Sequence, residues 1–200
     1  MKVVDISSNN GSVDFEKLAA DGVTAVMIRA TLGYGTSDNH LAANAAAASA
    51  AGLDIGYYHV CYADRKQGGT TDSDATAEAK WFLQCIAALP AAKWLIADCE
   101  TPTQLSRDEY QAWLKMWASI VDTTSGLQPV IYTYKSYMDA HLPGVHIFGG
   151  SPLWIANYDD VDTPPLPVGW NKYWLWQYTQ SGAVNGVEGH VDISREWGDS

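Results

Sequence analysis

Short apolar segments of strand length alternate with helical patterns along most of this 200-residue chain. Such alternation is typical of parallel sheets whose strands are joined by right-handed crossovers. Eight strand candidates are too many for a small open sheet and favour a closed α/β barrel. The predicted strands are Val3–Ile6, Val23–Ala30, Ile55–His59, Trp94–Ala97, Val130–Thr133, Leu153–Ala156, Trp174–Tyr178 and His190–Ile193.

Helical patterns are strongest in the first half of the chain. Ser106 and Glu109 form a capping box at the start of one helix, and Asn185-Gly186 predicts the turn of a late hairpin that delivers the last strand. From residue 130 onward the connections become short and irregular, so we expect reduced helices there. No linker or low-complexity segment interrupts the chain, and residues 1–200 are expected to form one domain. The predicted helices are Ser12–Ala20, Asn39–Ala51, Asp74–Leu89 and Ser106–Val121.

Charge and apolar content exclude several classes of partner. The net charge is −11 with no basic stripe, which argues against nucleic acid and anionic membrane surfaces. No stretch approaches the ~20 apolar residues that cross a bilayer. The N-terminus lacks a signal-peptide pattern, so we expect either release from the cytoplasm by another route or a leader already removed. The three cysteines fit neither a disulfide framework nor a zinc site and are expected to be buried: Cys61, Cys85 and Cys99.

Two carboxylates end the fourth predicted strand. Asp98 and Glu100 are separated by Cys99, so in a strand they point to the same side, about 6.6 Å apart along the backbone. An unpaired charge beside an apolar core is costly. One interpretation is a helix cap followed by a solvated acid. The other is a pair of carboxylates that divide acid, base or orienting roles at the rim of the sheet.

Two more acids share this predicted location. Active sites of such barrels lie at the carboxyl ends of the strands, and Asp5 and Asp192 are expected late in the first and last strands. The tetrapeptide Val-Asp-Ile-Ser occurs at Val4–Ser7 and again at Val191–Ser194, and the two copies would be neighbours in a closed barrel. Each Asp can instead cap its own turn. We favour a barrel mouth with four carboxylates.

A series of motifs in order along the chain resembles glycoside hydrolase family 25, the N-acetylmuramidase (lysozyme) family common among phage endolysins. The resemblance covers essentially all 200 residues, with departures at Asn10, Leu32 and Val60 that concern fine specificity. The motifs are Asp5-Ile6-Ser7, Ile28-Arg29-Ala30-Thr31, Gly56-Tyr57-Tyr58-His59, Asp98-Cys99-Glu100, Pro129-Val130-Ile131-Tyr132-Thr133, Leu153-Trp154-Ile155-Ala156-Asn157-Tyr158, Trp176-Gln177-Tyr178 and Gly189-His190-Val191-Asp192.

The resemblance implies a flattened TIM-like β/α barrel that cleaves the β-1,4 bond between N-acetylmuramic acid and N-acetylglucosamine in bacterial peptidoglycan. Glu100 would be the general acid/base and Asp98 its partner, while Asp5 and Asp192 would shape the charge of the site. It implies neither cofactor nor metal, and we expect a monomer that acts on the cell wall and has no separate wall-binding domain.

The catalytic route has two alternatives. Asp98 can attack the sugar directly, or it can orient the 2-acetamido group of the substrate as the nucleophile; we expect the second route, with retention of configuration. Nine Trp and eleven Tyr suit sugar stacking as well as an ordinary core. Five of them lie at or near strand ends and are candidates to bind substrate: Tyr58, Tyr132, Trp154, Tyr158 and Trp176.

Two rival functions stay open at the level of the sequence. One is a metal-dependent hydrolase that uses the same acids as ligands, although His59 and His190 lack the spacing of a metal site. The other is a non-catalytic module that binds cell-wall sugars, against which the intact Asp98 and Glu100 argue.

Overall fold

The computed structural model describes residues 1–142 and 150–196, and its strands and helices follow the predicted alternation. The strands are β1 (Lys2–Ile6), β2 (Val23–Leu32), β3 (Thr36–Ser37), β4 (Asp54–Val60), β5 (Trp94–Asp98), β6 (Val130–Tyr134), β7 (Leu153–Ala156), β8 (Leu175–Gly182) and β9 (Val191–Glu196). The helices are η1 (Ser8–Asn10), α1 (Phe15–Ala20), α2 (Leu41–Ala50), α3 (Thr71–Ile86), α4 (Arg107–Ser125) and α5 (Lys135–His141).

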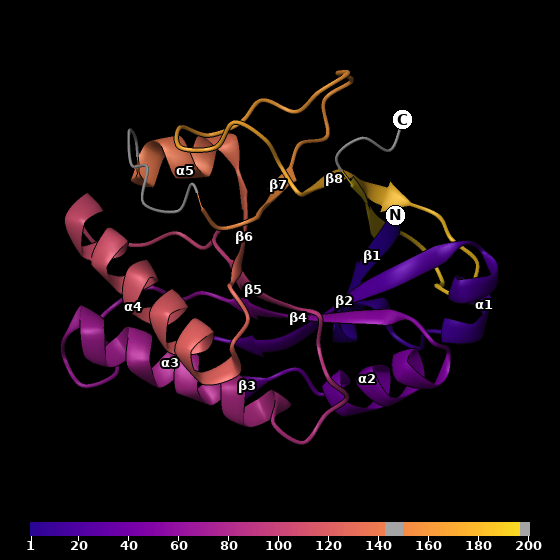
Figure 1. Ribbon diagram of the computed structural model, residues 1–200, viewed down its shortest axis with the longest axis horizontal. Helices are drawn as coiled ribbons and strands as arrows, with labels where there is room; N and C mark the ends of the chain where they lie inside the picture. Colours follow the sequence, from indigo (N-terminus) through magenta and orange to yellow (C-terminus); the bar gives the residue numbers. More distant parts are fainter. Residues whose placement is uncertain (143–149, 197–200) are drawn as a thin grey trace.

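Eight of these strands close into a barrel, as predicted. The order is β1-β9-β8-β7-β6-β5-β4-β2, and β1 also pairs with β2, which closes the ring; β3 adds a short hairpin to β2. In Figure 1 the strands surround the centre of the molecule, with α1 to α4 around one half. The other half carries the short α5 and irregular connections, which confirms the reduced helices of the second half.

The bounds of the last strand correct one prediction. β9 runs antiparallel to both of its neighbours, β1 and β8. It begins at Val191 and runs on to Glu196, so Asp192 is the second residue of the strand, and the prediction that Asp192 lies late in the strand was wrong. The reversal still brings it to the expected rim, because the start of an antiparallel strand lies beside the end of its neighbour. Asp5 pairs directly with Asp192, and the two Val-Asp-Ile-Ser copies are neighbours as predicted.

Element boundaries differ from the predictions by a few residues. α1 begins at Phe15 rather than Ser12, because the Asp14 carboxylate caps it by accepting from the Lys17 amide. α3 begins three residues before the predicted Asp74, after a Thr70–Ser73 capping box. The predicted capping box at Ser106 is confirmed. The late hairpin is confirmed as the β8–β9 pair, but residues 183–190 join its strands in place of a two-residue turn.

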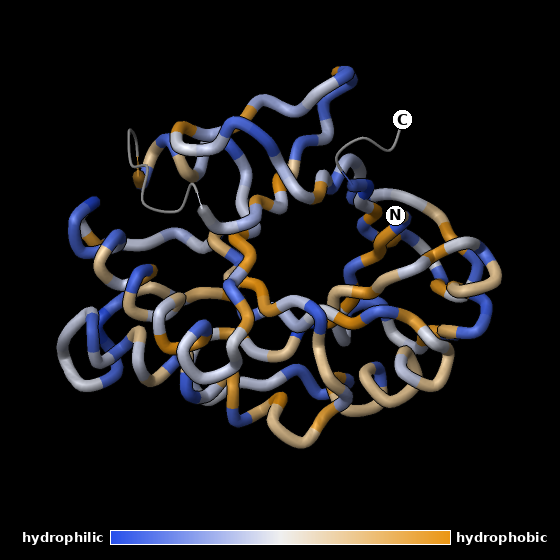
Figure 2. Tube along the Cα trace, viewed as in Figure 1, coloured by the Kyte–Doolittle hydropathy of each residue, from blue (hydrophilic) through white to orange (hydrophobic). Residues whose placement is uncertain are grey.

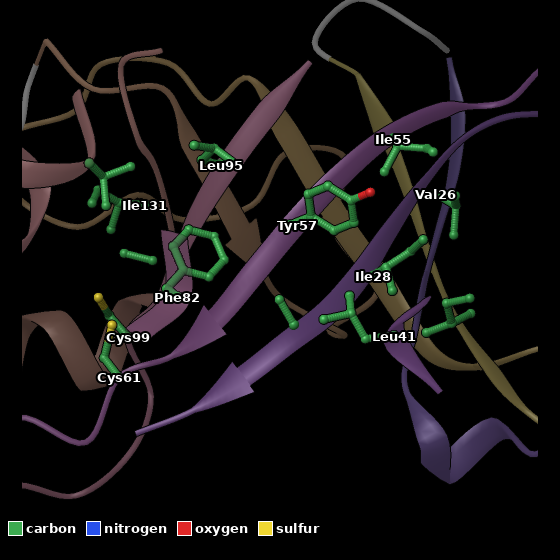
Figure 3. Packing of buried hydrophobic residues seen from close by; sticks show 14 of the residues in the cluster. Val26, Ile28, Leu41, Ile55, Tyr57, Cys61, Phe82, Leu95, Cys99 and Ile131 are labelled. Carbon is green, nitrogen blue, oxygen red and sulfur yellow. The ribbon is translucent and has the colours of Figure 1, made fainter. Parts of the chain in front are cut away.

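Buried side chains form two main layers, one inside the barrel and one between barrel and helices. The interior layer is filled by residues such as Met27, Ile96 and Leu175. The outer layer packs against α1 to α4 and includes Tyr57 and Phe82 (Figure 3). Hydrophobic residues follow the strands, whereas hydrophilic residues gather in the outer loops (Figure 2). Cys61 and Cys99 are buried in the outer layer as predicted, with their sulfurs side by side in Figure 3, and Cys85 is half-buried.

The alternation of side chains along the strands positions the site. In β2 the interior residue Met27 is followed two positions later by Arg29, and in β5 Ile96 is followed by Asp98. Residues two apart on a strand share a face. The apolar filling of the barrel therefore gives way to charged side chains at its mouth.

Candidate active site

A cleft of about 410 Å³ opens at the barrel mouth, and all four predicted acids line it. Three of them belong to strands, Asp5 to β1, Asp98 to β5 and Asp192 to β9, and Glu100 follows the end of β5 by two residues. The full lining is Asp5, Ile6, Ser7, Asn9, Asn10, Arg29, Leu32, Tyr58, Val60, Asp98, Glu100, Tyr132, Trp154 and Asp192.

Asp5 and Asp192 are held together by an amide side chain. Gln177 Nε2 donates to Asp5 Oδ2 at 2.9 Å and to Asp192 Oδ2 at 3.4 Å. Burial, followed by the neighbouring Asp192 charge, raises the pKa of Asp5 well above its ordinary value. Burial also raises the pKa of Asp192. Two carboxyl groups that contact the same amide nitrogen do not both ionise readily, so the Asp5–Asp192 pair favours one shared proton.

Asp98 forms the buried floor of the cleft. Its side chain is only 5% exposed, and no residue in the described part of the chain donates a hydrogen bond to its Oδ1. Burial and then the charge of Glu100 raise its pKa well above the ordinary range, with the Arg29 cation opposing them. A buried acceptor without a partner is costly, which makes this oxygen available to a ligand donor.

Glu100 is more open and lies between two hollows. It lines the central cleft and also a neighbouring pocket of about 620 Å³, and Tyr132 likewise lines both. Partial burial, followed by the Asp192 charge, raises the pKa of Glu100. A carboxyl group in this position can reach a ligand that occupies both hollows and can hold a proton under mildly acidic conditions.

One cation stands within the acidic mouth. Arg29 contacts the buried Asp38 through Nη2 at 2.8 Å and through Nε at 2.9 Å. Asp38 also accepts from the Ser8 and His40 amides. Although burial opposes the charge of Asp38, these hydrogen bonds hold its pKa below the ordinary value. The ion pair fixes Arg29 and ties the β1–α1 segment to β2.

Three of the five aromatic candidates form one wall of the cleft. Tyr58, Tyr132 and Trp154 line it, and the rings of Tyr132 and Trp154 meet edge to face with centroids 4.6 Å apart. Tyr132 Oη donates to Gln177, and Trp154 Nε1 donates to Ser194. Their polar edges are thus satisfied by the protein, and the rings are held rigidly.

The other two candidates lie elsewhere. Tyr158 is 44% exposed, lines the neighbouring pocket, and donates to Gln177. The structure does not bring Trp176 into the cleft. It packs on the outer face of the barrel with Leu153, Ile155 and Tyr173, because the next residue of β8, Gln177, is the one that points inward. Neighbouring residues of a strand face opposite sides, so Trp176 and Gln177 do not both line the cleft.

Gln177 and Arg29 contact the acids of the site, and the sequence analysis did not select them. Each follows an interior apolar residue by two positions in its strand, Leu175 in β8 and Met27 in β2. That spacing was the available signal, since a polar residue in phase with a barrel interior must lie at the mouth.

No group of three or more His, Cys, Asp or Glu side chains in the described ranges 1–142 and 150–196 is arranged to hold a metal ion. His59 lies behind the barrel wall, away from the four acids of the cleft. Its ring nitrogens are hydrogen-bonded to Thr31 Oγ1 at 2.7 Å and to Glu78 Oε2 at 2.8 Å. Within the same ranges, no helix has both the length and the apolar character needed to span a membrane.

An eight-stranded α/β barrel with four acids and aromatic side chains at its mouth fits a barrel glycoside hydrolase. The chain belongs to glycosyl hydrolases family 25, whose sequence model matches residues 4–187.

Curated relatives and a solved structure are similar over nearly the whole chain. The autolytic lysozyme of Clostridium acetobutylicum is 33% identical over 193 residues, covering 96% of this chain and 55% of that protein. Lysozyme M1 of Streptomyces globisporus is 26% identical and is covered to 66%. The bacterial lysozyme structure from Streptomyces coelicolor superposes with a TM-score of 0.84 at 24% identity, covering 100% and 93% of the two chains, which shows the shared fold. The chain thus spans between half and two thirds of the length of these curated relatives.

Proposed function

We propose that this chain is a muramidase that hydrolyses the β-1,4 bond between N-acetylmuramic acid and N-acetylglucosamine in bacterial peptidoglycan. Membership of the family and relatives that carry the name lysozyme support a wall glycan as the substrate. The bacterial cell wall is accordingly the proposed place of action.

The position of Glu100 carries the proposal. It stands on the border between the central cleft and the neighbouring pocket, where a bond between two sugar units would lie. Its raised pKa keeps a proton available for the leaving oxygen. Glu100 therefore acts as the general acid, and after the bond breaks its carboxylate takes a proton from the attacking water.

Asp98 orients the nucleophile. Its buried Oδ1 has no donor among the described residues, and the N–H of a 2-acetamido group is a donor of the right kind. Accepting that hydrogen bond would direct the acetamido oxygen at the anomeric carbon. The acetamido oxygen bonds to this carbon as the glycosidic bond breaks, which forms a five-membered oxazoline ring. Water later attacks the same carbon from the face that the departed sugar occupied, and the bond to the acetamido oxygen breaks. The product then retains its β configuration.

Digestion of purified bacterial walls tests the proposal. We expect the turbidity to fall and the released fragments to carry reducing-end muramic acid in the β configuration, measured by mass spectrometry and NMR. Reducing-end glucosamine would indicate a glucosaminidase instead of a muramidase, and free amino groups would indicate a peptidase. Wall binding without lysis would indicate a sugar-binding module. Inhibition by EDTA that zinc reverses would indicate a metal-dependent hydrolase.

The same digestion separates the two catalytic routes. A covalent sugar adduct trapped on Asp98 would favour direct attack over acetamido assistance, and an α-configured product would mean inversion.

A further inference from the structure

The β2–β3 hairpin presents an exposed tyrosine beside the cleft. Leu32 pairs with Thr36, so residues 33–35 form the loop of the hairpin and Tyr34 is its tip. Gly33 and Gly35 flank it at φ +52° and +82°, a region that favours glycine. The Tyr34 side chain is 52% exposed. A large aromatic ring held in solvent by two such glycines has no role in the core.

Helix α3 holds this tip in place. The ring centroids of Tyr34 and Trp81 lie 6.0 Å apart, and Trp81 Nε1 donates to the Thr36 carbonyl at 3.2 Å. One turn earlier on α3, Glu78 accepts from the Tyr62 amide. The helix therefore anchors both loops that follow β2 and β4. The aromatic pair is fixed before any ligand arrives, which lowers the entropy cost of binding.

The aromatic pair lies close to the central cleft along the chain. Leu32 and Val60 line the cleft, and Tyr34 and Tyr62 each stand two residues further along the same chain segments. Two residues span at most about 7 Å. The ring of Tyr62 also packs against Gly33, where an added Cβ would meet Tyr62 Cδ2 at 2.8 Å. A glycan strand that extends from the cleft past Leu32 would therefore pass close to Tyr34.

The surroundings of the pair suit a polyhydroxylated ligand. Tyr34 and Trp81 line a shallow hollow together with a polar stripe on α3, formed by Thr76, Lys80 and Gln84. These three are spaced by four residues and so share one face of the helix. Flat rings bounded by hydroxyl, amide and ammonium groups can stack on a sugar and hydrogen-bond its substituents.

We propose that Tyr34 and Trp81 form a distal saccharide subsite, which binds further units of the glycan strand whose bond is cut at Glu100. This inference rests on the proposed function, and it identifies a long glycan strand as the preferred substrate. With Tyr134 and Tyr158 in the pocket beyond Glu100, the strand has aromatic contacts on both sides of the cleavage point. The enzyme then favours internal bonds of long strands over short oligosaccharides.

Paired substrates test the subsite. We compare kcat/KM on long peptide-free glycan strands with kcat/KM on a tetrasaccharide of the same repeat. Tyr34→Ala should lower the ratio of kcat/KM on long strands to kcat/KM on the tetrasaccharide about tenfold, equivalent to about 1.4 kcal/mol. Tyr34→Phe, which keeps the ring, should restore the ratio, and Trp81→Phe should change it less than Trp81→Ala. Tyr178→Ala is the matched control, since Tyr178 is 38% exposed but lies beside Arg195 instead.

Strand binding to the inactive Glu100→Gln variant measures the contribution of the subsite to affinity without turnover. Calorimetry with the same long strands should give a Kd about tenfold weaker when Tyr34→Ala is added. An unchanged ratio and an unchanged Kd in variants with wild-type melting temperatures would overturn the subsite. If the wild-type chain cuts no muramic bond but Tyr34→Ala still weakens strand binding, the proposed reaction fails and the subsite stands.

Discussion

At the scale of single residues, two neighbouring acids have different environments. Asp98 is buried, with one oxygen that has no hydrogen-bond partner among the described residues, whereas Glu100 is open on the border of two hollows. Pairs of titratable groups in contrasting environments divide the roles in acid–base catalysis. The more accessible group is the one that can reach the leaving oxygen, which is why we propose Glu100 as the proton donor.

Glu100→Gln should lower the rate of wall lysis by roughly 10²–10⁴-fold, because the amide keeps the shape of the side chain but has no acidic proton. The rate of turbidity loss measures this, with circular dichroism to verify the fold. Glu16→Gln, at an exposed acid on α1, serves as the control and should keep the wild-type rate. If Glu100→Gln retained more than about a tenth of the activity, the role assigned to it would be wrong.

Asp98→Asn should stabilise the fold at neutral pH while it impairs lysis. Burial raises the pKa of Asp98 above its unfolded value, so its favourable contribution is complete below about pH 4 and is lost as pH rises through the folded pKa. Removing the charge should raise the free energy of unfolding at pH 8 by about 1–3 kcal/mol, with little gain at pH 4.

Thermal melts at the two pH values measure this difference; each kcal/mol corresponds to roughly 2–4 °C for a chain of this size. A variant that is equally destabilised at pH 4 and pH 8 would mean that Asp98 is needed for packing rather than for its charge.

At the scale of elements, strand positions were predictable from the sequence, and so was the direction of the last strand. The apolar segments that became β1, β2 and β4 to β7 are each followed by a connection long enough for parallel pairing with the next barrel strand. The predicted late hairpin implied that β9 runs antiparallel to β8, and the structure shows this pairing. The bounds of β9 were less predictable: the strand runs on to Glu196 instead of ending at Ile193, so Asp192 was placed late in its strand although its rim was correct.

The four acids were predictable, and their amide partner was not. Two-residue spacing and the repeated Val-Asp-Ile-Ser identified the carboxylates from local sequence alone. Gln177 joins Asp5 and Asp192 only after β8, β9 and β1 lie side by side. Trp176 was selected because aromatic residues suit both sugars and cores, and only the phase of β8 shows that it lies on the outer face.

Helix α4 offers a prediction at this scale. Ser106 Oγ accepts from the Glu109 amide, and Glu109 accepts in turn from the Ser106 amide. Ser106→Ala should destabilise the fold by about 1 kcal/mol, because the first turn loses its cap. Ser119→Ala, at an exposed site within the same helix, should be neutral or slightly stabilising, since alanine favours helix. Urea denaturation of the two variants gives the comparison, and equal effects would contradict a capping role.

At the scale of the whole molecule, acids of the mouth control one another's protonation. Burial raises the pKa of Glu100, and the charge of Asp192 raises it further. The protonated general acid is therefore retained to higher pH than in an isolated glutamate, and activity should favour acidic to near-neutral conditions. A rate that increased steadily up to pH 9 would contradict a protonated Glu100.

Asp192→Asn should shift the alkaline limb of the pH–rate profile to lower pH. Without the Asp192 charge the pKa of Glu100 falls, so its proton is lost earlier as pH rises. Rates of lysis measured from pH 4 to pH 9 give the limb, and Asp122→Asn on the exposed face of α4 is the control. A profile that coincided with that of the wild type apart from its height would remove Asp192 from the electrostatics of the site.

The late position of β9 also bears on when the site comes into being. Ribosomes deliver β1, with Asp5, at the start of synthesis, but the strand that pairs with it and supplies Asp192 comes some 190 residues later. Until that strand emerges, the ring stays open and Gln177 has only one of its two carboxylates to bridge. A chain that ends before β9 therefore lacks Asp192 and the assembled mouth.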